Sequence, residues 1–158
     1  MSDEKKMKQA QAVYGALCSM LDERGWRYDK NDEKMTIHCG AQGDDLPMNI
    51  VMEVDMKREL ISLLSMMPFA IPENRRIPMA IAVSRANYGL IDGSFDYDCT
   101  SGKIIFRLTS SYTGSLIGKN LLSYMLSCSC YTIDEYNDKF LMVAKNDMTT
   151  EQILEFIK

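Results

Sequence analysis

Residues 35–67 read MTIHCGAQGDDLPMNIVMEVDMKRELISLLSMM, and this stretch decides the fold class. Apolar and polar residues alternate over 35–40 and 48–56, as they do in strands with one buried face. Residues 60–67 are mostly apolar, which is typical of a buried strand. With an earlier strand that begins at Trp26, the pattern predicts a four-stranded antiparallel meander. The side chains expected on its buried face are Met35, Ile37, Cys39, Met48, Ile50, Met52, Val54 and Met56.

Helices are predicted before and after this meander. Residues 3–24 place apolar residues on one helical face, and Gly25 provides a natural end. Residues 74–89 show two apolar stripes, so we expect this helix to be buried more deeply than the first. Pro78 must then lie in the first turn of the helix or kink it. The two stripes are Ile77, Ala80, Ile81, Ser84, Asn87 and Tyr88, and Met79, Val83, Ala86 and Leu90.

A second hairpin and further helices complete the chain. Residues 90–98 and 103–110 read as its two strands, and residues 114–130 have helical apolar spacing. Thr132–Glu135 and Thr149–Gln152 each have the spacing of a capping box, which marks the start of a helix. The predicted order is therefore α-β-β-β-β-α-β-β-α-α, with a third C-terminal helix left open. The fold class is α+β, with an antiparallel sheet and helices packed on it.

The composition is that of one ordinary folded domain, which we assign to residues 1–158. Hydrophobic residues make up 46% and charged residues 25% of the chain, which excludes a disordered protein. The formal net charge is −4. A general nucleic-acid binder needs a basic surface, so we expect no nucleic-acid partner.

Two features indicate a cytoplasmic protein. The N-terminal residues are polar, unlike a secretory signal, and no run of about 20 apolar residues could span a membrane. The cysteines number five and include no Cys-x-x-Cys pair. We therefore expect reduced thiols rather than disulfides or zinc ligands.

The sequence offers no convincing catalytic set. His38 is the only histidine, and its neighbour Cys39 should point to the opposite face of the same strand. Asp96 and Asp98 share a strand face and could hold a hard cation, but aspartates beside a hairpin turn usually accept backbone hydrogen bonds. Gly114–Asn120 lacks the spacing and the Ser or Thr of a phosphate-binding loop. We expect no enzyme, cofactor or resident metal.

Two groups of residues are candidates for binding a partner. One is the set of arginines on the middle helix, which could receive a carboxylate or a phosphate or simply face solvent. The other is a methionine-rich sheet face, which is either a groove for a peptide or a loosely specified core. The two sets are Arg75, Arg76 and Arg85, and Met48, Met52 and Met56.

A further pattern surrounds the second hairpin and includes an earlier tryptophan. It consists of Trp26, Asn87, Gly93, Phe95, Asp98, Gly102, Phe106 and Arg107. In these residues the chain resembles the YbjN family of small bacterial proteins. The chemistry of the residues is structural: Asp98 can close the turn, the glycines permit unusual backbone geometry, and the two phenylalanines can pack across strands.

The YbjN resemblance implies a fold like that of type III secretion chaperones, which are small, acidic and often dimeric. It also implies a regulatory role in sensory transduction or stress, and no catalytic residues. We therefore expect a non-enzymatic protein-binding module, chaperone-like or regulatory, that forms a homodimer and binds a protein or peptide. The alternatives are a small-molecule or metal-binding sensor and a metal-dependent enzyme that uses Asp96 and Asp98.

Overall fold

The computed structural model describes residues 3–158, and its elements follow the predicted order. The helices are α1 (Asp3–Glu23), α2 (Arg76–Gly89), α3 (Lys119–Lys145) and α4 (Thr150–Phe156), with a short 3-10 turn, η1 (Glu73–Arg75), before α2. The strands are β1 (Tyr28–Asn31), β2 (Thr36–Gln42), β3 (Pro47–Asp55), β4 (Leu60–Met66), β5 (Ser94–Asp98) and β6 (Lys103–Ser111). None of these helices is both long enough and apolar enough to cross a membrane.

The six strands form one antiparallel sheet in the order β1-β2-β3-β4-β6-β5. The first four strands form the meander that the sequence predicts. After β4 the chain passes through α2 and returns as the β5–β6 hairpin, with β6 beside β4. The register places apolar residues opposite one another across the centre of the sheet, so that Leu63 lies between Met52 and Leu108.

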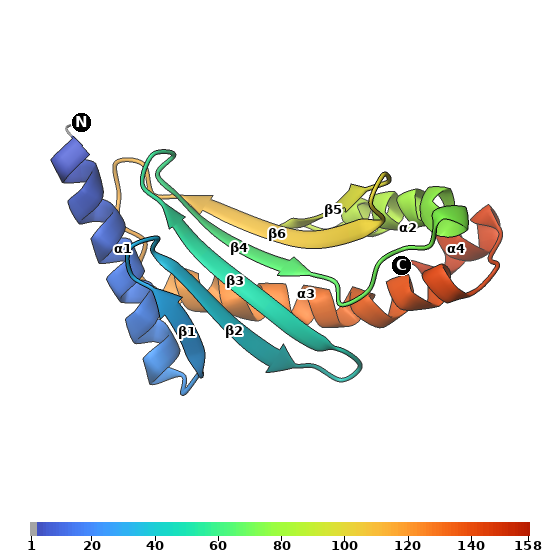
Figure 1. The fold of residues 1–158 in the computed structure, drawn as a ribbon, viewed down its shortest axis with the longest axis horizontal. Helices are drawn as coiled ribbons and strands as arrows, with labels where there is room; N and C mark the ends of the chain where they lie inside the picture. Colours follow the sequence, from blue (N-terminus) through green and yellow to red (C-terminus); the bar gives the residue numbers. More distant parts are fainter. Residues whose placement is uncertain (1–2) are drawn as a thin grey trace.

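Helices cover one face of this sheet, as Figure 1 shows. α1 stands across the β1 end, and α3 runs along the length of the sheet. α2 and α4 pack against each other at the opposite end, where α2 also contacts α3 and β5. The hydrophobic core lies between the sheet and the helices, and its strand residues include Ile37, Ile50, Met52, Leu63 and Phe106.

The capping box predicted at Thr132–Glu135 is wrong, because α3 continues unbroken through it. Buried side chains extend on both sides of this point, from Leu126 through Ile133 to Phe140. A continuous buried stripe stabilises one long helix and outweighs a local start signal. The predicted start at residue 114 is wrong as well, because Gly114 has a φ of 68° and Gly118 is the N-cap residue.

The second predicted capping box is confirmed at the start of α4. Thr149 Oγ1 accepts a hydrogen bond from the Gln152 amide at 3.3 Å, and Gln152 Oε1 accepts one from the Thr149 amide at 2.8 Å. Pro78 lies in the first turn of α2, as one of the two predicted alternatives required. Proline costs little there because the amide that it lacks has no helical acceptor.

Three predictions of burial need correction. Met35 and Met56 lie in turns rather than on the inward face of a strand, and Met35 has a φ of 50°. The middle helix is not buried on both sides. Its stripe with Met79 and Val83 is buried, whereas Ile77 and Tyr88 on the other stripe are exposed.

A side-chain amide joins α2 to β5, which is an edge strand. Asn87 Nδ2 donates to the Phe95 carbonyl at 2.9 Å, and Asn87 Oδ1 accepts from the Phe95 amide at 2.8 Å. Asn87 therefore satisfies two backbone groups that an edge strand would otherwise leave free. The Phe95 ring packs edge-on against Phe106 with centroids 5.2 Å apart. Gly93 is required beside this pair, because a Cβ there would lie within 3.0 Å of the Phe106 ring and the Arg107 carbonyl.

The β5–β6 turn is closed by Asp98 and Gly102. The Asp98 carboxylate accepts hydrogen bonds from the Thr100 amide at 2.9 Å and the Ser101 hydroxyl at 2.6 Å, and these bonds lower the pKa of Asp98. Gly102 has a φ of 72°, and its carbonyl accepts a hydrogen bond from the Ile71 amide at 2.8 Å. A Cβ on Gly102 would lie less than 3.0 Å from the Ile71 carbonyl oxygen.

We expect Gly102→Ala to lower the free energy of unfolding by about 2–4 kcal/mol, because it combines a positive φ with a backbone clash. Gly15→Ala is the matched control: Gly15 lies on the exposed side of α1, and a Cβ there would meet no neighbouring group within 4 Å. The control should raise stability by up to about 1 kcal/mol. Urea unfolding of both variants measures the difference, and equal stability of Gly102→Ala and wild type would contradict this account.

Candidate partner-binding surfaces

The methionine-rich sheet face lies inside the protein. Met48 and Met52 are buried, and they project from β3 toward the layer that contains α1 and α3. Met56 lies half-buried in the turn after β3. The sequence left open whether the methionine-rich face is a groove or part of the core. In the structure Met48 and Met52 belong to the core.

The three arginines bind main-chain carbonyls in three separate places. Arg75 is buried, and its Nε donates to the Val143 carbonyl at 3.1 Å near the end of α3. Arg76 Nη1 donates to the Thr100 carbonyl at 2.6 Å, in the β5–β6 turn. Arg85 Nε donates to the carbonyl of Ile157 at 3.1 Å. These bonds fix α2 to its neighbours, and they leave no shared cationic spot around Arg75.

The candidate catalytic and metal residues are also held apart. His38 is exposed on the uncovered face of the sheet, whereas Cys39 is buried on the other face. Asp96 Oδ2 forms an ion pair with Arg107 Nη2 at 2.5 Å, and Asp98 is bonded within its turn. Within residues 3–158, no three His, Cys, Asp or Glu side chains are arranged to hold a metal ion.

The Gly114–Asn120 segment is held by α1 rather than arranged around a ligand. Gln9 Nε2 donates to the Tyr112 carbonyl at 2.7 Å and also to the Ser115 carbonyl. Trp26 is partly buried against the core, with the Arg24 guanidinium 6.0 Å from its ring centroid. Both contacts are structural.

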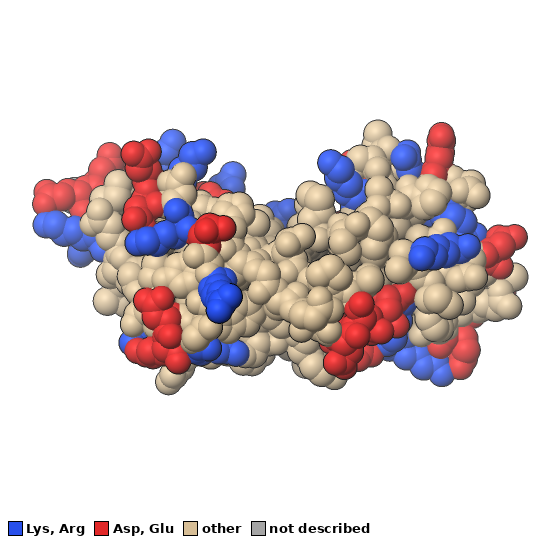
Figure 2. Space-filling view, turned by 60° about the horizontal axis from the view of Figure 1, so that its bottom comes forward, with Lys and Arg blue, Asp and Glu red and all other residues tan. Residues whose placement is uncertain are grey.

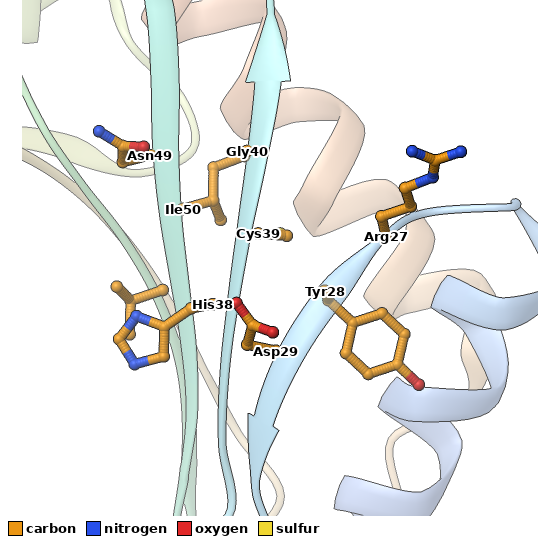
Figure 3. A pocket seen from close by; sticks show the side chains of 9 residues that line it. Arg27, Tyr28, Asp29, His38, Cys39, Gly40, Asn49 and Ile50 are labelled. Carbon is orange, nitrogen blue, oxygen red and sulfur yellow. The ribbon is translucent and has the colours of Figure 1, made fainter.

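A polar hollow of about 500 Å³ lies over β1, β2 and β3. Gly40 is one of its lining residues and places no side chain in it. Figure 3 shows His38 and Asn49 on the outer side of the strands, with Cys39 and Ile50 on the inner side and Tyr28 turned toward α1. The hydroxyl of Tyr28 donates to Asp22 Oδ1 at 2.9 Å, which fixes this side of the hollow to α1.

An apolar groove of about 560 Å³ lies between α2 and α4. At its two ends are Ile77, with 70% of its surface exposed, and Tyr88, with 86% exposed. A contiguous exposed apolar patch of this kind usually marks an interaction site. We name it the α2–α4 groove, and its lining residues are Ile77, Ala80, Ile81, Ser84, Arg85, Tyr88 and Leu154.

A second, smaller pocket is strongly acidic. It has a volume of about 280 Å³ and lies between the β2–β3 loop and α3. Figure 2 shows acidic side chains gathered near the β2–β3 loop, beside a broad central area without charged groups. Burial, followed by the charges of Asp138, Asp134 and Asp44, raises the pKa of Asp45. We name it the acidic pocket, and its lining residues are Asp44, Asp45, Tyr131, Asp134, Glu135, Asp138 and Lys139.

The loop and the helix that form the acidic pocket are in direct contact. Asp134 on α3 accepts hydrogen bonds from the Asp44 amide at 3.0 and 3.1 Å. Gly43 permits this approach, since a Cβ there would overlap the Asp134 carboxylate. The Asp134 carboxylate is therefore held in place by a backbone amide and not by an opposite charge.

The sequence predicts neither surface. The first lies on a helical stripe that the sequence does show, but such a pattern does not tell whether another part of the same chain covers it. The stripe residues that line it are Ile77, Ala80, Ile81, Ser84 and Tyr88. The acidic pocket joins residues about 90 positions apart, as the Asp44–Asp134 bond shows. Only Tyr124 and Tyr131, spaced by two helical turns beside Leu121, give a local signal of the exposed side of α3.

Comparison with known proteins places the chain in a known fold. No family model matches it, and no curated protein matches it in sequence. Among solved structures, YbjN from E. coli, for which a role in transcription regulation has been suggested, superposes with a TM-score of 0.58 at 14% identity, over 78% of this chain and 90% of that one.

Two complexes give the same result. The HopA1–SchA chaperone–effector complex contains a chain that matches with a TM-score of 0.56 at 13% identity, over 81% of this chain and 96% of that one. The ExsC–ExsE complex contains one with a TM-score of 0.59 at 14% identity, over 82% and 93%. These likenesses confirm the YbjN-like, chaperone-type α+β fold that the sequence predicts.

Proposed function

We propose that residues 1–158 act as one non-enzymatic, protein-binding domain, chaperone-like or regulatory, in the cytoplasm. The fold supports this, since one protein of the same fold was solved as a chaperone–effector complex. Asp98 and Asp96, which could have held a metal ion, are used in turn hydrogen bonds and in an ion pair with Arg107. The five free cysteines fit a reducing compartment.

The α2–α4 groove is the observation that carries the proposal. Ile77 and Tyr88 project from the same side of one helix, and Leu154 of α4 lies on the adjoining wall. Transfer of apolar surface out of water stabilises a complex by about 25 cal/mol per Å². A groove of this kind therefore gains free energy when another polypeptide covers it.

We propose that a second copy of the chain covers this groove and forms a homodimer. Ala80 and Ser84 are small and lie midway between Ile77 and Tyr88, so two α2 helices can approach closely at their centres. The ends of the stripe are eleven residues apart, or roughly 16 Å at 1.5 Å per residue. In an antiparallel pair, Ile77 of one copy then meets Tyr88 of the other, as a twofold axis requires.

A second candidate function is the binding of a small polar molecule in the hollow over Gly40. The hollow presents a carboxylate, an imidazole and a carboxamide, from Asp29, His38 and Asn49. A sensor would use such a set to recognise a ligand with both donors and acceptors.

Native mass spectrometry of the purified chain tests the second candidate. A copurified small molecule should be lost from Gly40→Val, whose side chain would project into the hollow, and kept by Gly15→Val on the exposed side of α1. A spectrum that contains only the chain and its oligomers, after gentle purification from the native cell, would count against the sensor.

The homodimer is tested by Ile77→Glu, which places a charge in the α2–α4 groove. Ile91→Glu is the matched control, because Ile91 is 97% exposed and does not line the groove. In light scattering, wild type and the control should show twice the chain mass of 18.0 kDa, and Ile77→Glu should show 18.0 kDa. A wild-type chain that stays at the monomer mass at every concentration would exclude the dimer.

Protein binding itself is tested by crosslinking in the native cell, followed by reconstitution of the complex with the purified partner. The partner should raise the melting temperature of the chain in a saturable way, since a ligand that binds only the folded state stabilises it. Turnover of a metabolite by the pure chain, lost when one polar side chain is replaced, would contradict the proposal of a non-enzymatic protein.

A further inference from the structure

We propose that the exposed side of α3, together with the acidic pocket, binds a basic amphipathic polypeptide segment. The inference rests on the proposed protein-binding function and names the chemistry of the partner. Apolar side chains of the segment would lie on the outer stripe of α3, and its Lys or Arg side chains would enter the acidic pocket. The outer stripe consists of Leu121, Tyr124, Cys128 and Tyr131.

The outer stripe has the spacing of a helix interface. Its members follow one another at intervals of three and four residues, which places them on one side of α3. Tyr131 is 73% exposed, and Leu121 and Tyr124 are exposed as well. The opposite side of α3 is buried under the sheet through residues such as Leu126 and Ile133. α3 is therefore apolar on two sides, of which one is buried and the other is exposed or half-buried, with the Tyr124 hydroxyl donating to Asp92.

The acidic pocket adjoins the outer stripe directly, because Tyr131 belongs to both. The pocket contains five carboxylates and a single ammonium group, that of Lys139. This ammonium group already pairs with Glu135 and lies 5.1 Å from the centroid of the Tyr136 ring. Like charges face one another across the pocket, so a cation from outside would relieve their repulsion.

The two parts together select the occupant. A metal ion does not explain the apolar stripe, and no three carboxylates of residues 3–158 are arranged to hold one. A nucleic acid would be repelled by the carboxylates. A second copy of the chain carries the same net charge of −4 and does not complement the carboxylates of the pocket. The surface proposed for a second copy is the α2–α4 groove, which no carboxylate lines. A basic amphipathic segment complements both the stripe and the pocket.

The probe is a fluorescein-labelled, amidated 15-residue peptide of leucine and lysine, with leucine at helical spacing of three and four. A second peptide with glutamate in place of lysine is the control. Fluorescence anisotropy at low salt should show saturable binding of the lysine peptide to the full chain and none of the glutamate peptide.

Charge variants test the acidic pocket. Asp45→Asn with Asp138→Asn should weaken binding of the lysine peptide by roughly tenfold, the effect of about two surface charge pairs. Glu33→Gln with Glu53→Gln changes the net charge equally but lies in the β1–β2 turn and on the uncovered sheet face. This control should keep the wild-type affinity within about twofold. Equal weakening by both pairs would show general attraction to a negative protein and would overturn the proposal.

Tyrosine variants test the outer stripe. Tyr131→Ala should weaken binding about fivefold both at low salt and at about 0.3 M salt, because apolar contacts are not screened. Tyr88→Ala, in the α2–α4 groove, should leave peptide binding unchanged even where it changes the oligomeric state. Loss of binding in Tyr88→Ala but not in Tyr131→Ala would show that the peptide binds the α2–α4 groove and would exclude the outer stripe.

The failure of this site can be told apart from the failure of the proposed function. A partner identified in the native cell that binds wild type, Tyr131→Ala and the Asp45/Asp138 variant equally well would exclude the outer stripe and the acidic pocket. It would leave the chain a protein-binding module.

Discussion

The structure depends on the burial of one face of an antiparallel sheet beneath a single long helix. Alternating side chains supply a continuous apolar face across the sheet, with Ile37, Met52, Leu63 and Phe106 near its middle. α3 is the element that runs along this face, over 27 residues. The other helices pack at its two ends. α1 covers the β1 end and α2 with α4 the β5 end, so the sheet sets the place of every helix.

This constraint explains which features the sequence could predict. Alternation in Met48–Val54 requires one buried face, and it correctly predicts the antiparallel meander. The chemistry of Thr149 and Gln152 is local, and it predicts the start of α4. Thr132 carries an equally good signal but lies within a buried stripe. Local signals thus hold at the ends of elements and fail where tertiary burial spans them.

The candidate surfaces could not be predicted in the same way, for a physical reason. A helical stripe such as that of Ile77 and Tyr88 has the same pattern whether its own chain, a second copy or water covers it. The acidic pocket depends on the approach of Gly43 to Asp134, a contact between segments that no local pattern connects. The expectation that the arginines bind a partner has a different difficulty. Carbonyls near the end of α3 and in the β5–β6 turn accept hydrogen bonds from Arg75 and Arg76, so residues that seemed free to bind a partner stabilise the fold.

The arrangement has one consequence for the surface as a whole. A domain of two layers covers one face of its sheet and one side of each helix, and the outer sides must then be polar or find partners. In this chain the sheet's outer face is mostly polar, with exposed His38, Asn49 and Glu53. The outer sides of α2 and α3 are not. Their apolar residues are concentrated in two places, one beside an arginine and one beside five carboxylates. The two apolar surfaces therefore differ in the charge beside them, which is positive at the α2–α4 groove and negative at the outer stripe.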